Sequence, residues 1–470
     1  MKIVLAHYHL KTGGVTSVLK QQIRAIEKDC EVLVLTGEIP DLPFPAEIKL
    51  IPGFGYGSGS SIKKFSPEEV AESIVKAIYS KWKDGCDILH IHNPLLAKNK
   101  DFLKILKELQ KKKMRLFLQI HDFAEDGRPL AYFTEDEYIP NCHYGVINSR
   151  DYKILLASGL KKEGLHKLSN TIEPIEVKNY DTKIKKYILY PIRAIRRKNI
   201  GEAILLSLFF KNNETLFITQ PPNSPIDVTS YNGWKEFVKK NRLNVLFEAG
   251  LKYDFKQLVN KAEFLITTSI TEGFGFSFLE PWTAGKIICG RKLPEICYDF
   301  EQNNIKLDHL YEKLLVPVEW IDKKNFYKRW RSSVVKACSL FNYKINNKDI
   351  EKSFSAITNN NIDFGLLDES FQKQVITYIL SDKTEKNRMQ SLNQHLLTVG
   401  EIPDREHIIQ NNMKAVLTNY NTSTYKEKLL GIYSKACKKQ VTQCIDKKIL
   451  LSEFLNLDKF SLLKWGDYVK

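Results

Sequence analysis

The 470-residue sequence has few cysteines and no long apolar run, and both features exclude classes of protein. Its eight cysteines are scattered without any Cys-x-x-Cys spacing, which excludes a zinc ribbon or a small disulfide framework. The longest apolar stretch, 203–210, is interrupted by Ser207 and falls far short of the ~18 residues that span a membrane. The first residues lack the apolar core of a signal peptide. We therefore expect a soluble, cytoplasmic protein with reduced thiols.

Acidic residues are in the minority, because 71 Lys and Arg face 55 Asp and Glu and give a net charge of +16. Such a surplus favours anionic ligands in general, and basic runs are usually solvated faces. The sequence contains no recognisable RNA- or DNA-binding motif, so we expect no nucleic-acid partner. The basic helical segment 102–113 has a composition that suits peripheral contact with the inner membrane face. An ordinary amphipathic helix packed on the sheet, with its lysines in water, is the alternative interpretation of this segment.

Apolar residues make up 43% of the chain, enough for substantial cores. Short apolar runs alternate with helical periodicity over the first ~170 residues and again up to about residue 300, a pattern typical of doubly wound parallel sheets. A polar stretch with Pro174 reads as a linker between the two sets. We predict an α/β fold with domains at 1–172 and 185–345, followed by a helical extension, 346–470, without an assigned role.

The motif richest in chemistry is Glu272-Gly-Phe-Gly275, which follows an apolar strand and precedes a helical segment with Glu280. Glycines at a strand-to-helix turn let backbone N–H groups approach a ligand closely, and a helix N-terminus favours phosphate. Glu272 is expected at the strand end, where open parallel sheets bind ligands. Glu280, about two turns along the expected helix, would suit ribose hydroxyls. An ordinary turn with two solvated glutamates is the alternative.

The spacing from Glu272 to Glu280 resembles the paired-glutamate signature of retaining glycosyltransferases with the GT-B fold, in particular family 4. That fold has two Rossmann-like domains facing a cleft. Four other segments match the family in the expected order: Gly13-Gly14-Val15, Asp87 to Pro94, His121-Asp122, and Tyr190 to Asn199.

The resemblance implies roles for single residues. Arg193 and Lys198 would hold the donor diphosphate, and Glu280 would bind the ribose. Glu272 would contact the transferred sugar, and His121 would meet it from the N-terminal domain; these two are the catalytic candidates. The remaining donor-binding candidates are backbone or loop positions: Gly14, Gly273, Phe274 and Gly275.

The activity implied is that of a retaining hexosyltransferase whose donor is a UDP-, GDP- or ADP-linked sugar. No cofactor and no metal are expected, since the sequence has neither Asp-x-Asp nor a cluster with zinc-ligand spacing. The acceptor, a small molecule, glycan or lipid, would be chosen by N-terminal loops such as 53–61 and 124–132. The alternatives are a nucleotide-sugar epimerase or hydrolase on the same fold and a basic nucleic-acid-binding protein.

The sequence departs from the family pattern at several positions. Pro191 stands near an expected glycine and would alter the approach to the diphosphate, and Pro281 would break a helix that begins at Phe276 unless the helix restarts there. Arg291 and Lys292 are unusual, and we expect them to help fix the donor or an anionic acceptor. Solvent-exposed surface is the expectation for Arg196 and Arg197, and a structural role for His90 and His92.

Overall fold

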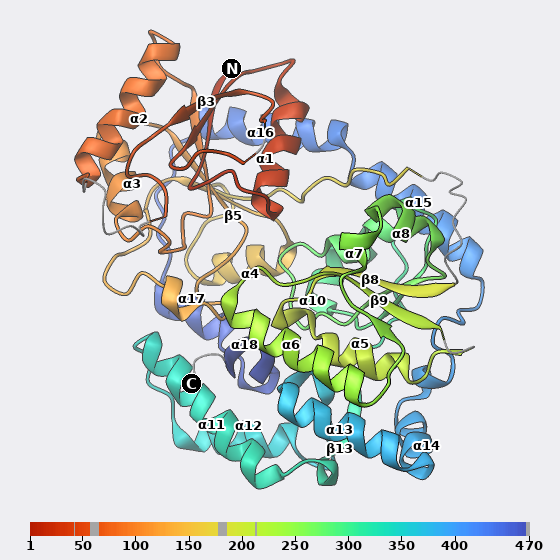
Figure 1. Cartoon of the computed structure of the whole chain (residues 1–470). Helices are drawn as coiled ribbons and strands as arrows, with labels where there is room; N and C mark the ends of the chain where they lie inside the picture. Colours follow the sequence, from red (N-terminus) through yellow and green to blue (C-terminus); the bar gives the residue numbers. More distant parts are fainter. Residues whose placement is uncertain (42, 57–64, 177–185, 212–213, 467–470) are drawn as a thin grey trace. The chain divides into compact units, whose positions relative to one another are not determined.

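The computed structural model describes residues 1–41, 43–56, 65–176, 186–211 and 214–466 (Figure 1). The chain forms two compact units, each treated separately below. Unit 1 comprises Met1–Thr171 and Tyr420–Leu455, and unit 2 comprises Ile172–Asn419 and Asn456–Lys470. Parts of the expected linker and of the loop 53–61 lie outside the described residues. Both units are built on parallel sheets, which confirms the predicted fold class.

Unit 1 contains a seven-stranded parallel sheet in the order β3-β2-β1-β4-β5-β6-β7. Its strands are β1 (Lys2–His7), β2 (Glu31–Thr36), β3 (Glu47–Leu50), β4 (Ile88–His92), β5 (Leu116–Ile120), β6 (His143–Val146) and β7 (Leu165–Lys167). The strand order reverses between β1 and β4. The carboxyl ends at such a switch point form the usual ligand-binding edge of a doubly wound sheet.

Helices cover both faces of this sheet. The helices in the N-terminal segment of unit 1 are α1 (Gly14–Ile26), α2 (Pro67–Lys81), α3 (Phe102–Lys111) and α4 (Ser149–Ala157). Ile3 and Leu5 of β1 pack on the side of α1, and Val4 and Ala6 pack on the side of α2 and α3. Alternate strand residues face opposite sides, so a strand buried on both faces is continuously apolar.

Unit 2 contains a five-stranded parallel sheet in the order β10-β9-β8-β11-β12. Its strands are β8 (Tyr187–Arg193), β9 (Thr215–Gln220), β10 (Val245–Leu246), β11 (Leu265–Thr267) and β12 (Ile288–Gly290). The helices that follow these strands are α5 (Ile200–Ser207), α6 (Pro225–Lys240), α7 (Ala249–Lys252), α8 (Phe255–Lys261), α9 (Glu280–Thr283) and α10 (Pro294–Gln302). The loops after β8 and β11 lie at the carboxyl ends of neighbouring strands.

The C-terminal third of the chain is mostly helical, but it is divided between the two units. Unit 2 receives α11 (Lys323–Leu340), α12 (Asn347–Ile357), α13 (Glu369–Ser381), α14 (Lys383–Leu392), α15 (Arg405–Asn419), α18 (Leu462–Trp465) and a short antiparallel pair, β13 (Leu315–Pro317) with β14 (Asn361–Asp363). Unit 1 receives α16 (Thr422–Lys438) and α17 (Lys447–Phe454). Among the described helices, none combines the length and apolar character needed to cross a membrane.

Buried polar contacts explain why α16 belongs to unit 1. The Gln22 side-chain amide donates to the hydroxyl of Tyr425 over 2.7 Å, and the Tyr433 hydroxyl lies 2.8 Å from Nδ1 of His90 in the sheet. Buried polar groups need such partners, because an unmade hydrogen bond in the interior costs about 1–3 kcal/mol. The residues 346–470, expected as one extension, are therefore shared between two units rather than forming a separate part. His90 has the structural role that was expected of it.

Candidate functional site

In unit 2, hydrogen bonds join the loop after β8 to the loop after β11. The Tyr190 hydroxyl donates to the carbonyl of Lys198 over 2.6 Å and accepts from the backbone N–H of Thr268 over 3.2 Å. The Thr268 hydroxyl donates to the same Lys198 carbonyl over 3.1 Å. These bonds fix the backbone of Lys198 beside the end of β11, so that the Lys198 side chain lies next to the loop after β11.

Glu272 and Lys198, 74 positions apart, form an ion pair in this place. The Glu272 residue is 8% exposed. Burial by itself would raise the pKa of Glu272, but the charges of Lys198 and Arg197 and hydrogen bonds from Lys198 and Ser269 hold it below the ordinary value. Glu272 is thus a buried, ionised carboxylate. Two residues to which the resemblance gives roles are in direct contact.

The Gly-x-Gly turn after Glu272 is tightly packed, since Gly273 is partly exposed but Phe274 and Gly275 are buried. Gly275 has φ of +93°, and a Cβ there would lie 3.0 Å from side-chain atoms of Ile296 and Phe278. The Phe274 ring is buried and packs edge-to-face on Phe276 and Phe300. A glycine is therefore required at 275, and Phe274 can offer a ligand only its main chain.

Glu280 opens a new short helix instead of lying two turns along a continuous one. A 3-10 turn, Phe276–Phe278, ends before α9, and Pro281 falls in the first turn of α9, where its missing N–H costs nothing. The interior-proline arrangement does not occur, and the restart is confirmed. The expected position of Glu280 was wrong. Because α9 has four residues, it adds little helix dipole to the site.

Two effects raise the pKa of Glu280 to about 7. Burial has the largest effect, the nearby charge of Glu173 adds to it, and the charge of Lys198 opposes both. The paired carboxylates therefore differ: Glu272 is ionised, whereas Glu280 is divided between its two protonation states near neutral pH. Such separated pKa values are common at functional sites.

Arg193 lies at the end of β8, past an irregularity that Pro191 explains. The pairing of β8 with β9 shifts register between Tyr190 and Arg193. Proline has no N–H to donate to the ladder, so pairing is interrupted in a strand that lies between two others. The Arg193 side chain is exposed and donates to the carbonyl of Pro221 over 3.2 Å. It remains accessible to an anion.

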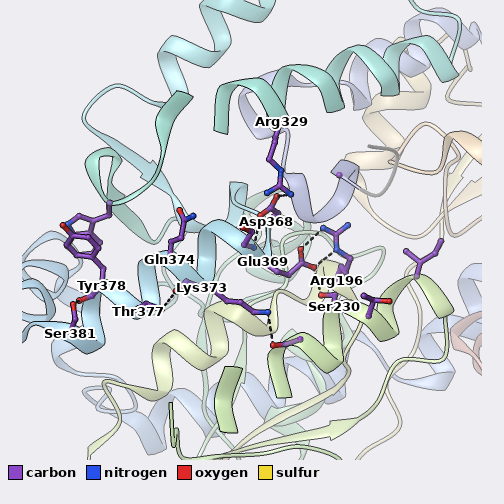
Figure 2. Close-up of a pocket in the computed structure, with 16 residues that line it drawn as sticks. Arg196, Ser230, Arg329, Asp368, Glu369, Lys373, Gln374, Thr377, Tyr378 and Ser381 are labelled. Carbon is purple, nitrogen blue, oxygen red and sulfur yellow. Dashed lines mark hydrogen bonds and ion pairs between the residues drawn. The ribbon is translucent and has the colours of Figure 1, made fainter. Parts of the chain in front are cut away.

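The expectation that Arg196 is a solvated residue was wrong. Its guanidinium makes two parallel hydrogen bonds to Glu369, from Nε over 2.6 Å and from Nη2 over 2.9 Å. Figure 2 shows this pair in the wall of a cavity of about 1020 Å³, where Glu369 also accepts from the hydroxyl of Ser230. A buried carboxylate on α13 needs a bidentate partner, and Arg196 supplies it. The ion pair with Glu369 therefore gives Arg196 a structural role within unit 2.

Arg197 was also expected to be solvated surface, yet its charge acts on Glu272. It is partly buried, and its carbonyl accepts from the backbone N–H of Ile270 over 3.0 Å. This contact ties Arg197 to the loop after β11. One feature of the sequence could have indicated this role: Arg197 directly precedes Lys198 in the segment that resembles the family.

Arg291 is not available to bind an anion, so the expectation that it helps fix the donor or an anionic acceptor was wrong. It is 4% exposed, and its five N–H groups donate to both oxygens of Glu202, both oxygens of Asp363 and the carbonyl of Glu312, over 2.7–3.0 Å. A guanidinium has five N–H donors, so none is left for a ligand. Lys292 pairs with Glu301 at 2.5 Å. The structure gives Arg291 a role in holding unit 2 together.

His121 lies in unit 1, directly after β5. Its backbone N–H donates to Oδ1 of Asn93 over 2.8 Å, and its Nε2 lies 2.9 Å from Nδ1 of His92. Burial lowers the pKa of His121 to about 4, with the charge of Asp122 opposing. His121 is therefore a neutral imidazole held at the carboxyl edge of the sheet.

Gly14 is the first residue of α1, at the same edge of the unit 1 sheet. A Cβ on Gly14 would meet no atom within 4 Å. Packing and backbone conformation thus leave the choice of glycine unexplained, and its role toward a donor stays a prediction. Across the described residues, no group of three or more His, Cys, Asp and Glu side chains could hold a metal ion.

Comparisons with known proteins agree with this architecture. No model of a protein family matches the sequence. The chain is 26% identical to the mannosylglucosyl-3-phosphoglycerate synthase of Petrotoga mobilis over 516 residues, which cover 98% of this chain and 99% of that enzyme.

Two solved structures share the fold over 92% of this chain. HepE of Anabaena, solved with UDP and glucose, has a TM-score of 0.53 at 11% identity, with 99% of its chain covered. The sucrose-phosphate synthase of Thermosynechococcus elongatus has a TM-score of 0.54 at 13% identity, with 98% covered. The chain has the fold of the GT-B glycosyltransferases. With the match along its whole length, it is an enzyme of the glycosyltransferase class.

Proposed function

We propose that this enzyme transfers a sugar from a nucleoside diphosphate sugar to a small acceptor with retention of configuration and without a metal ion. The observation that carries the proposal is the contact between Lys198 and Glu272 at the carboxyl ends of β8 and β11. A charged amine for a phosphate and an ionised carboxylate for a sugar are placed side by side there. The family 4 resemblance assigns the two residues to those ligands.

Charge balance supports a diphosphate as the ligand. Arg193 at the end of β8 and Arg197 and Lys198 in the loop after it contribute three positive charges. Glu272 pairs with Lys198, Asp227 lies within the electrostatic reach of Arg197, and Glu280 within that of Lys198. Arg196 is neutralised separately by Glu369. We propose that these basic side chains replace the divalent cation of other transferases, since preorganised positive charge stabilises a leaving phosphate.

The carboxylates suit the sugar and the ribose. Glu272 is ionised and can offset positive charge that develops on the sugar as the bond to phosphate loosens. Glu280, in its ionised form, can accept hydrogen bonds from the two ribose hydroxyls. The backbone of Gly273, which is partly exposed, can approach the donor, whereas Gly275 is buried and fixes the turn. Retention follows if the acceptor attacks the face from which the phosphate leaves.

The chemical class of the acceptor can be proposed from the relative that matches the full length of the chain. The Petrotoga relative is named for a mannosylglucosyl-3-phosphoglycerate product, and it matches this chain from end to end. We therefore propose a small glycoside carrying an anionic phosphoglycerate group as the acceptor. A glucosyl phosphoglycerate should be glycosylated, whereas free glucose should not. Release of the nucleotide without any sugar–acceptor adduct would instead favour the hydrolase alternative.

A thermal-shift panel of UDP-, GDP- and ADP-linked sugars tests the first step. One nucleotide class should raise the melting temperature, because a ligand at 100 times its Kd adds about 2.7 kcal/mol to the free energy of unfolding. The free monosaccharides are the control and should have no effect. If no nucleotide sugar shifts the transition, the proposal fails at donor binding.

The pKa of Glu280 predicts a pH dependence for donor binding. If the ribose needs the carboxylate, binding below about pH 7 must expel a proton, so affinity falls as pH falls. The Kd of the nucleotide sugar should be about tenfold higher at about pH 6 than at about pH 8. Isothermal titration calorimetry measures it, and a diphosphate sugar is the right probe because its phosphates do not titrate in this range.

A Glu280→Gln variant is the matched control, since it cannot titrate and should bind with the same affinity at both pH values. A tenfold change that persists in this variant would assign the dependence to another group. Tighter binding at the lower pH would contradict a carboxylate contact with the ribose.

A further inference from the structure

Two histidine pairs in unit 1 have the same geometry. Nδ1 of His92 lies 2.9 Å from Nε2 of His121, with the rings 15° from parallel and their centroids 5.2 Å apart. Nδ1 of His143 lies 2.8 Å from Nε2 of His166, with the rings 9° from parallel at the same centroid separation. In each pair one nitrogen must donate and the other accept, and the surroundings decide which.

The surroundings of His143 settle the second pair. Its Nε2 lies 2.8 Å from the carbonyl oxygen of Lys439, and a carbonyl can only accept. In the neutral ring the proton is therefore on Nε2, and Nδ1 of His143 is an acceptor. His166 must then donate from Nε2, which leaves its own Nδ1 without a proton.

The surroundings of His92 differ at one atom. Its Nε2 is buried and has no hydrogen-bond partner among the described residues. A proton on that nitrogen would be a buried donor with no acceptor, which is rarer and costlier than an acceptor left unfilled. Burial, the largest effect, and three neighbouring histidines lower the pKa of His92, so the ring is neutral. The single proton therefore belongs on Nδ1, facing His121.

We propose that His92 is a positioning residue that donates from Nδ1 to Nε2 of His121 and so fixes His121 as the tautomer with its proton on Nδ1. Nδ1 of His121 makes no hydrogen bond to any described residue, so this N–H is free for a ligand. Asn93 supports the arrangement by accepting from the backbone N–H of both His121 and Asp122, over 2.8 and 3.0 Å. The strand-end sequence His92-Asn93 thus sets both the place and the proton of His121.

The consequence is a hydrogen-bond donor, not a base, at the carboxyl edge of the unit 1 sheet. A donor suits an oxygen of the transferred sugar, whereas the opposite tautomer would offer only a lone pair. This consequence rests on the proposed function, but the tautomer itself does not. The two can therefore fail separately.

The first test uses the whole protein without ligand. Long-range ¹H–¹⁵N correlation spectra of [¹⁵N]histidine-labelled enzyme at about pH 8 distinguish protonated from unprotonated ring nitrogens. We expect Nδ1 protonated in His121 and Nε2 protonated in His166, with resonances assigned by single His→Asn variants. The oppositely arranged pair is an internal reference in the same spectrum. Protonation of His121 on Nε2 would overturn the proposal.

The second test separates positioning from packing. A His92→Asn variant keeps an amide N–H near the position of Nδ1, and a His92→Leu variant removes it. We expect His92→Leu to lower kcat about tenfold with little change in donor KM, to leave His121 a mixture of tautomers, and to be rescued in both readouts by His92→Asn. A His92→Leu enzyme with unchanged kcat and an unchanged His121 tautomer would refute the assignment. If no nucleotide sugar is turned over by the wild type, the proposed function fails while the spectra still decide the tautomer.

Discussion

A Glu272→Gln variant is expected to lose about a hundred- to a thousandfold in kcat while binding the nucleotide sugar at least as well as the wild type. The loss is that of one preorganised electrostatic contact to the transition state. Binding should persist because Lys198, now free of its carboxylate partner, can turn wholly to the diphosphate. Steady-state kinetics, with calorimetry for the donor, measure the two effects.

The control for this experiment is Glu319→Gln, which removes a glutamate of unit 2 whose pair with Arg388 is exposed. It should keep wild-type kcat. Exposed pairs of this kind contribute about 0–1 kcal/mol to stability. If Glu272→Gln is as active as Glu319→Gln, Glu272 does not contact the reacting sugar and the central assignment is lost.

An Arg291→Met variant is expected to destabilise unit 2 by about 3–5 kcal/mol, the usual result of removing one partner from a buried ion pair. Glu202 is fully buried and would lose two charge-assisted hydrogen bonds, and Asp363 would lose two more. Burial already raises the pKa of Glu202, against the opposing charge of Arg291. Without Arg291, the penalty should grow as pH rises above the ordinary pKa of a glutamate.

Chemical denaturation followed by tryptophan fluorescence suits this measurement, because five of the six tryptophans, all except Trp82, lie in unit 2. Lys211→Ala is the matched control, since its pair with Glu401 is half exposed on both sides and should change stability by less than about 1 kcal/mol. Equal effects from the two variants would show that Arg291 does not hold the unit together. Retained donor binding in Arg291→Met would agree with its structural role.

Local patterns in the sequence predicted the elements and the ends of several of them. In the structure Ser66 and Glu69, three positions apart, form a capping box at the start of α2. Pro281 predicted where a helix could restart, and α9 begins beside it. These features depend on neighbours within four residues, so they are readable without the fold.

The residues that sequence reasoning misjudged depend on distant partners. Arg196, Arg197 and Arg291 all stand in basic contexts that are typical of solvated surface or anion sites. Only the fold shows that Arg196 faces Glu369, 173 positions away, and that Arg291 faces Glu202, 89 positions away. A guanidinium looks the same in sequence whether its partner is water, a phosphate or a buried carboxylate.

The sequence alone determined the two parallel-sheet units, the Gly-x-Gly turn after β11 and the candidate residues, because apolar periodicity and glycine placement act locally. The tertiary structure alone decided four things: the pairing of Lys198 with Glu272, the different protonation of Glu272 and Glu280, the division of the C-terminal helices between units, and the partner that sets the proton of His121. Each depends on burial and on distances between residues far apart in the chain, which the order of residues does not encode locally.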